Sequence, residues 1–117
     1  IRINMTLIFS VPQALIAAKA GADFISPFAG RLDDLGVDGM DLIRDCADML
    51  RNYDFESEII TASVRGAHHI TAASLAGAHI ATVPPDTLMK LFNHPLTDKG
   101  LIQFNQDWEK ANLKIFD

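Results

Sequence analysis

Apolar runs and amphipathic segments alternate along the chain, and this alternation predicts an ordered series of strands and helices. Four runs are rich in β-branched and other apolar residues, which is typical of buried strands. Each is followed by a segment whose apolar residues recur every three or four positions, the period of one buried helix face. The predicted strands span residues 1–9, 23–28, 58–63 and 79–84. The predicted helices span residues 13–22, 38–52, 67–76, 86–92 and 97–112, and residues 30–36 form a predicted loop.

Residues that favour helix ends support these boundaries. Ser10 can accept a hydrogen bond from the first turn of the helix that follows it, and Pro12 is tolerated in that turn. Gly21 and Gly77 come directly after alanine-rich segments, where glycine often ends a helix. Thr97 is the predicted N-cap of the last helix.

The order β-α-β-α-β-α-β-α predicts a parallel sheet with helices packed over it. A weak internal repeat relates "AAKAGADFISP" (17–27) to "AASLAGAHIATVP" (72–84), and the glycines in the two copies are 56 positions apart (77 − 21). This spacing equals two βα units of about 28 residues, and even units with right-handed crossovers suit a (β/α)₈ barrel. Four units make half of such a barrel. The alternative is a complete four-stranded open sheet with helices on both faces.

Polar residues inside the predicted strands favour the barrel. Strands of an open sheet that is covered on both faces are apolar almost throughout. These strands instead carry polar residues, namely Asn4, Thr6, Ser26, Thr61 and Ser63. Inward polar residues near the carboxyl ends of strands are typical of a barrel active site. We therefore expect an α/β fold of four successive βα units with a parallel sheet, half of a TIM barrel, as one unit over residues 1–117.

The amino-acid composition and net charge exclude some classes of protein and some partners. The chain has 117 residues, of which 49% are apolar and 21% charged, as in a single globular domain. A net charge of −5 argues against nucleic acid or an anionic membrane as a partner, because both attract basic surfaces. The lone Cys46 excludes an internal disulfide, favours a cytoplasmic location and is interpreted as a small buried residue. Because the chain enters a strand at Ile1 without a methionine, we expect it to begin inside a larger unit.

Polar and cationic residues gather where the first three predicted strands end. In a parallel sheet these carboxyl ends converge on one rim, and alternate residues of a strand share one face. The rim residues predicted from this pattern are Asn4 and Thr6 on the first strand, Ser26, Phe28 and Arg31 on the second, and Ser63 and Arg65 on the third.

Two arginines at this rim suggest an anion site. A guanidinium group binds phosphate through paired donors, so Arg31 and Arg65 form a plausible clamp. Gly66 and the start of the next helix would add backbone N–H donors. In the alternative interpretation Arg31 pairs with Asp33 or Asp34, and Arg65 is merely solvated.

The remaining polar residues are weaker candidates for a functional site. The adjacent His68 and His69 are expected to point apart on a helix and to make a poor metal site. His79 and His94 are interpreted as structural. Asp33 and Asp34 are interpreted as loop or capping carboxylates, and no nucleotide-binding glycine loop is present in the sequence. We therefore expect neither a metal nor a cofactor.

Four stretches, in this order, resemble the transaldolase family. They are "NMTLIFS" (4–10), "ISPFAGRLDDLG" (25–36), "ITASVR" (60–65) and "HPLTDKGLIQFNQDW" (94–108). The resemblance covers essentially the whole chain and is closest to the small transaldolase-like group that includes fructose-6-phosphate aldolase. It implies a (β/α)₈ barrel of which this chain is strands five to eight plus the C-terminal helix. It also implies transfer of a dihydroxyacetone unit between sugar phosphates through a lysine Schiff base, without metal or cofactor.

The resemblance implies roles for the rim residues. Asn4 and Thr6 would line the pocket beside the Schiff base, and Ser26 and Phe28 would line it from the next strand. Arg31, Ser63 and Arg65 would hold the substrate phosphate. Phenylalanine at position 28 resembles transaldolases, whereas tyrosine there resembles fructose-6-phosphate aldolases, so transfer is favoured over aldol cleavage.

The same resemblance implies that the Schiff-base lysine lies outside this sequence. The lysines present all fall outside the predicted strands, at positions 19, 90, 99, 110 and 114. The isolated chain is therefore expected to be inactive, and its open sheet edges should pair with the missing half or with a second copy. A stripe of Leu101, Phe104 and Trp108 on the last helix is expected either to contact neighbouring subunits in a ring or to pack on its own barrel.

Overall fold

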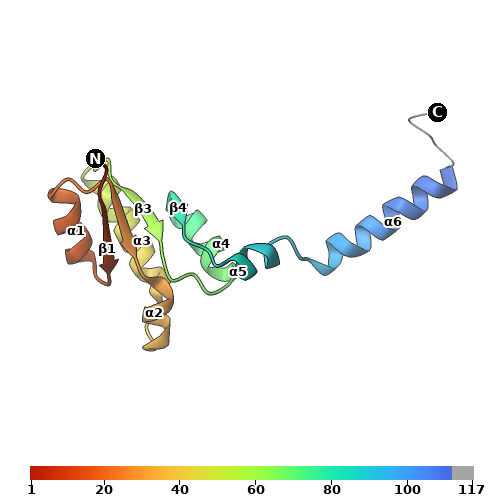
Figure 1. Ribbon diagram of the computed structural model, residues 1–117, viewed down its shortest axis with the longest axis horizontal. Helices are drawn as coiled ribbons and strands as arrows, with labels where there is room; N and C mark the ends of the chain where they lie inside the picture. Colours follow the sequence, from red (N-terminus) through yellow and green to blue (C-terminus); the bar gives the residue numbers. More distant parts are fainter. Residues whose placement is uncertain (112–117) are drawn as a thin grey trace.

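The computed structural model describes residues 1–111, in which four strands alternate with helices (Figure 1). The strands are β1 (Asn4–Ile8), β2 (Phe24–Pro27), β3 (Glu58–Thr61) and β4 (Ile80–Ala81). The helices are α1 (Val11–Lys19), α2 (Ala29–Asp34), α3 (Gly39–Asn52), α4 (Ala67–Ala76), α5 (Pro85–Lys90) and α6 (Pro95–Ala111). The predicted order of elements is confirmed, and each strand lies within its predicted range. The predicted end of the last helix, residue 112, lies outside the described residues.

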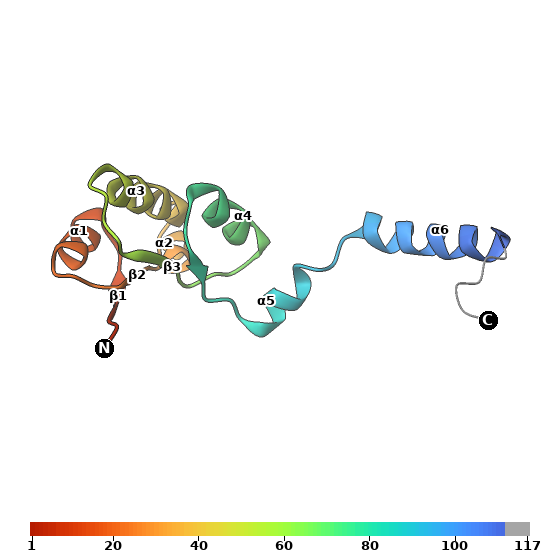
Figure 2. The same ribbon diagram turned by 90° about the horizontal axis from the view of Figure 1, so that it is seen from above.

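The four strands form one parallel sheet in the order β1-β2-β3-β4. Figure 2 shows α1, α3 and α4 side by side along one face of this sheet. An open sheet covered on both faces would place helices on opposite sides, so that alternative does not describe the molecule. The predicted fold class is confirmed: the chain is an α/β unit of four parallel strands alternating with helices, a partial TIM-barrel-like unit.

The core lies between the sheet and these three helices. Ile25 of β2, Ile59 of β3 and Ile43 of α3 are completely buried there. Cys46 of α3 is also completely buried, and this desolvation raises the pKa of its thiol to about 12. Since a thiol with that pKa stays protonated, the interpretation of Cys46 as a small core residue is confirmed.

The predicted helix signals act as expected at the start of the chain. The Ser10 hydroxyl accepts a hydrogen bond from the Gln13 N–H, 3.4 Å away, and Pro12 lies in the first turn of α1. Gly21, with φ of +93°, follows the end of α1 in the left-handed conformation. At the start of α3 the Asp38 carboxylate accepts the Met40 N–H at 3.0 Å, which caps that helix.

Three sequence-based predictions were wrong. The predicted loop over residues 30–36 begins instead as α2, because its first N–H groups find acceptors: Ala29 and Gly30 donate to the carbonyls of Ala62 and Ser63, directly after β3. Thr97 does not cap α6, which begins at Pro95 because the His94 imidazole accepts the Leu96 N–H at 3.1 Å.

Thr61 was one of the polar strand residues that were expected to face into the barrel. It instead shares the face of Ile59, two positions earlier on β3, which packs in the core under the helices. Thr61 is completely buried, and within the described residues its hydroxyl has no hydrogen-bond partner.

Several parts of the described chain leave large apolar side chains uncovered, and two of them bear on the predicted contacts. At the β1 edge, Met5 is 41% exposed and Leu7 51% exposed. On α6, which extends away from the α/β unit in Figure 1, the predicted stripe of Leu101, Phe104 and Trp108 is 56%, 70% and 44% exposed. Across residues 1–111 every helix is too short or too polar to traverse a bilayer.

Candidate active site

The adjacent strands β1 and β2 bring the first predicted site residues together, with Asn4 at the start of β1 and Ser26 near the end of β2. The Ser26 hydroxyl donates to Asn4 Oδ1 across 2.7 Å, and Ser26 itself is buried. Thr6 pairs with Ser26 in the sheet register and is exposed. Between Thr6 and Ile8 the register shifts, with Leu7 at a φ of +63°. Such an irregularity ends regular pairing and redirects the side chains of the strand.

Phe28 and Arg31 form an aromatic and cationic group where β2 turns into α2. The Phe28 ring is tilted against Phe9, with ring centroids 5.7 Å apart. The Arg31 guanidinium lies over the same ring, 5.2 Å from its centre. Arg31 thus makes a cation–π contact with Phe28. Among residues 1–111, Arg31 forms no salt bridge. The alternative pairing of Arg31 with Asp33 or Asp34 is therefore wrong.

Ser63 lies directly against the start of α2. Its φ of +58° places it in the left-handed region, which costs a non-glycine residue about 1–3 kcal/mol. Its carbonyl accepts the Gly30 N–H at 3.0 Å. A Cβ on Gly30 would lie 2.1 Å from this carbonyl oxygen and 2.8 Å from the Ser63 hydroxyl. Only glycine at position 30 allows α2 to approach the end of β3 so closely.

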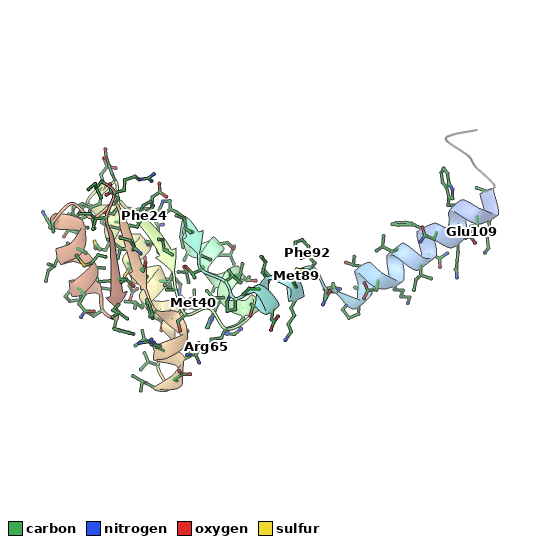
Figure 3. All side chains as sticks on the ribbon, viewed as in Figure 1. Phe24, Met40, Arg65, Met89, Phe92 and Glu109 are labelled. Atoms are coloured by element: carbon green, nitrogen blue, oxygen red, sulfur yellow. The ribbon has the colours of Figure 1, made fainter. Side chains whose placement is uncertain are left out.

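Arg65 is held by a carboxylate of α2. Two of its guanidinium nitrogens donate to the two oxygens of Asp34, at 2.7 and 2.8 Å, in a bidentate pair. The hydrogen bonds from Arg65 hold the pKa of the Asp34 carboxyl below its ordinary value, and Arg31 adds a smaller effect in the same direction. Both cations thus act on one acidic group. The alternative that Arg65 is merely solvated is wrong, and Figure 3 shows Arg65 beside α2.

A buried histidine for which the sequence indicated no functional role adjoins this pair. The His69 ring is 1% exposed, its Nε2 lies 2.6 Å from Asp33 Oδ2, and its Nδ1 accepts the Arg65 N–H at 2.9 Å. The other oxygen of Asp33 accepts the Gly39 N–H at 2.8 Å. That hydrogen bond and the contact with His69 lower the pKa of the Asp33 carboxyl. The interpretation of Asp33 as a capping carboxylate is confirmed.

The expectation that His68 and His69 point apart was wrong. Their rings lie with centroids 4.2 Å apart, because the chain enters α4 in this turn from the extended Gly66. Ligand atoms of Asp33, His68 and His69 all lie within 4.8 Å of one another. Both nitrogens of His69 already have hydrogen-bond partners, one of them Asp33, and the His68 ring lies against the His69 ring.

The other histidines support the backbone, as interpreted from the sequence. The His79 Nδ1 accepts the Ile59 N–H at 3.1 Å, and His94 caps the start of α6. The lysines that the structure describes lie on α1, α5 and α6, at positions 19, 90, 99 and 110, and Lys114 lies outside the described residues.

Fold and site together define a class of protein. It is a parallel α/β unit of partial TIM-barrel type, with the Ser26 hydroxyl near the carboxyl end of β2 and the Arg65 guanidinium in the segment after β3, where barrel enzymes carry their active sites. The chain matches the Transaldolase/Fructose-6-phosphate aldolase family over residues 1–115 and belongs to that family. The predicted family is thus confirmed.

Curated relatives agree with this assignment. The chain is 58% identical over 97% of its length to a "Probable transaldolase" from Mesorhizobium japonicum, of which it covers 52%. It is 55% identical over 98% of its length to a "Probable transaldolase" from a Thermoanaerobacter species, of which it covers 53%. The chain therefore spans about half the length of the curated relatives it matches.

Proposed function

We propose that this chain is the phosphate-binding half of a transaldolase-type enzyme, which transfers a dihydroxyacetone unit between sugar phosphates through a Schiff base. Family membership supports the reaction type. Ser63 and Arg65, which follow β3, contact the two ends of α2: the Ser63 carbonyl accepts the Gly30 N–H and the Arg65 guanidinium pairs with Asp34. These contacts support the phosphate site and are the observation that carries the proposal. As one unit, residues 1–117 would act only together with the half that carries the lysine.

The phosphate is held by Arg31, Ser63 and Arg65 in this proposal. A phosphate dianion accepts hydrogen bonds from planar guanidinium groups in pairs, which Arg65 already offers to the Asp34 carboxylate. An incoming phosphate competes with Asp34 for these donors. The strained backbone of Ser63 supports the assignment, because such strain clusters at functional sites.

The reacting end of the sugar lies beside Asn4, Thr6, Ser26 and Phe28. The hydrogen bond between Ser26 and Asn4 fixes the amide so that its NH₂ group can donate to a substrate oxygen. Phe28 presents a ring without a hydroxyl. A tyrosine at this position could pass a proton to the carbanion intermediate, whereas phenylalanine cannot, so the intermediate persists until an aldose acceptor arrives.

The nucleophilic lysine comes from outside this chain. A Schiff-base lysine needs a desolvated or cationic environment that lowers its pKa. The lysines on α1, α5 and α6 are exposed or lie at helix ends away from the rim residues, so none of them takes this role. Activity therefore requires the partner half of the barrel.

The exposed apolar groups indicate where partners attach. The β1 edge, with Met5 and Leu7, pairs with the missing half of the barrel or with a second copy. The stripe of Leu101, Phe104 and Trp108 on α6 contacts a neighbouring subunit, because α6 extends away from its own α/β unit. A ring of subunits joined through α6 would cover this stripe, whereas the β1 edge is covered by the missing half or the second copy.

Borohydride trapping with fructose 6-phosphate tests the proposal. The chain alone is compared with a completed barrel, in which residues 1–117 are joined to the half of the Mesorhizobium japonicum relative that this chain does not match. We expect a trapped sugar adduct, and transfer to an aldose acceptor, only in the completed barrel. A trapped adduct on the chain alone would disprove the absence of the lysine, and a completed barrel that is folded but traps nothing would disprove the function.

A further inference from the structure

His69 connects the candidate phosphate site to the acidic end of α2. Its Nδ1 accepts the Arg65 N–H, and a backbone N–H group can only donate. In neutral imidazole the ring proton must then sit on Nε2. Nε2 faces Asp33 Oδ2 at 2.6 Å, so this N–H donates to the carboxylate. One tautomer satisfies both contacts.

Asp33 is fixed in turn by α3. Its Oδ1 accepts the N–H of Gly39, the first residue of α3, so neither oxygen is free to turn away from its partner. The resulting chain of hydrogen bonds runs from Gly39 through Asp33 and His69 to the Arg65 backbone. It joins the start of α3, the end of α2 and the start of α4, three elements that pack around the end of β3.

We propose that His69, oriented by Asp33, is a positioning residue for phosphate binding: it fixes the backbone of Arg65 so that the guanidinium and Ser63 reach the substrate phosphate together. This inference rests on the proposed function. Neither residue contacts substrate; both act through Arg65.

The geometry gives the two consecutive aspartates complementary tasks. Asp33 holds the Arg65 backbone through His69, whereas Asp34 holds the Arg65 guanidinium directly. Arg65 follows Ser63 by two residues, so a backbone displacement at Arg65 also moves the left-handed turn. Displacements of about 1 Å in a binding group can reduce its contribution severely, which is why such a group is anchored at both ends.

Two amide variants of His69 separate the contact with Arg65 from the contact with Asp33. In His69→Asn the side-chain oxygen takes the place of Nδ1 and keeps the acceptor for the Arg65 N–H. In His69→Gln the amide reaches the place of Nε2 and keeps the contact with Asp33, but the Arg65 N–H loses its acceptor. Both variants are uncharged and smaller than histidine, so each serves as the control for the packing change in the other.

The dissociation constant of inorganic phosphate is measured for both variants in the completed barrel. Loss of one buried hydrogen bond predicts about five- to tenfold weaker phosphate binding in His69→Gln, and binding within about twofold of the parent in His69→Asn. Amide hydrogen exchange at Arg65 should be faster than in the parent in His69→Gln and close to the parent rate in His69→Asn. Equal phosphate affinity and equal exchange in the two variants would overturn the proposal.

The parent protein provides an independent test that needs no variant. Nitrogen-15 NMR of the His69 ring should show a protonated Nε2 and an unprotonated Nδ1. A proton on Nδ1 would overturn the proposal, even if neither variant folds. If the completed barrel fails to trap sugar or bind phosphate, the proposed function fails. The tautomer and the Arg65 exchange rates then still decide whether His69 positions Arg65.

Discussion

Replacing Gly30 by alanine tests the closest backbone approach in the candidate site. The new Cβ would lie 2.1 Å from the Ser63 carbonyl oxygen and 2.8 Å from the Arg65 Cγ. An ordinary contact begins at 3.4 Å, so α2 and the end of β3 must separate by about 1.3 Å (3.4 − 2.1). That shift breaks the hydrogen bond from the Gly30 N–H to the Ser63 carbonyl, now 3.0 Å long.

The expected cost follows from these two effects. Overpacking in a closely packed region costs about 1–3 kcal/mol. Loss of the hydrogen bond adds about 0.5–1.5 kcal/mol, so Gly30→Ala should reduce the free energy of unfolding by about 2–4 kcal/mol. With a urea dependence of about 1–3 kcal/mol per molar, the unfolding midpoint should fall by about 1–2 M.

Urea unfolding of the completed barrel, followed by circular dichroism, measures this cost. Gly100→Ala on α6 is the matched control, because its Cβ would meet no atom within 4 Å. The control should leave the midpoint unchanged or raise it slightly, since alanine favours a helix by about 0.5–1 kcal/mol over glycine. Phosphate affinity should fall in Gly30→Ala alone, because Ser63 and Arg65 move. Equal midpoints for the two variants would refute the close approach of α2 to β3.

Three further predictions concern the same rim. In the completed barrel, Arg31→Ala or Arg65→Ala should raise the KM for phosphorylated sugars about tenfold or more, because each removes charge-assisted hydrogen bonds; unchanged values in both would refute the clamp. Phe28→Tyr should raise aldol cleavage relative to transfer, and an unchanged product ratio would contradict the role of Phe28. Asp34→Asn removes a carboxylate whose folded pKa is lowered by Arg65, so its stabilising effect exists above the ordinary value of 3.8 and disappears as pH falls through the folded value. The parent and this variant should therefore differ in thermal stability at neutral pH and converge as the pH falls below the lowered pKa of Asp34, and a difference that grows on acidification would refute the pairing.

Local signals in the sequence predicted the elements and much of the candidate site. Alternating apolar periods, Ser10 at the start of α1 and Gly21 after its end act over a few residues, so the order of strands and helices follows from them. Alternate residues of a strand share one face, and the contact of Ser26 with Asn4 on neighbouring strands follows from that rule. Phe28 and Arg65 were likewise found from their position after a strand.

Tertiary packing decided the partners of these residues, because the contacts join positions far apart in sequence. His69 lies three residues after Gly66, where a side chain can reach back toward the helix start, and that spacing was the available local signal. Its partner Asp33 is 36 positions away, and no local pattern relates the two. Asp34 meets Arg65 across 31 positions for the same reason.

The sequence by itself thus determined the four βα units and the position of polar residues near the strand ends, which resembles the transaldolase family. Both features depend on periodicity and short-range sterics. Only the tertiary structure decided that residues 29–34 form a helix, because the N–H groups that begin it are satisfied by the carbonyls of Ala62 and Ser63 after β3. It also decided that Arg65 is anchored at its backbone and at its guanidinium by neighbouring aspartates. Folding brings α2, β3 and α4 to one place, and hydrogen bonds with angstrom tolerances select the partners there.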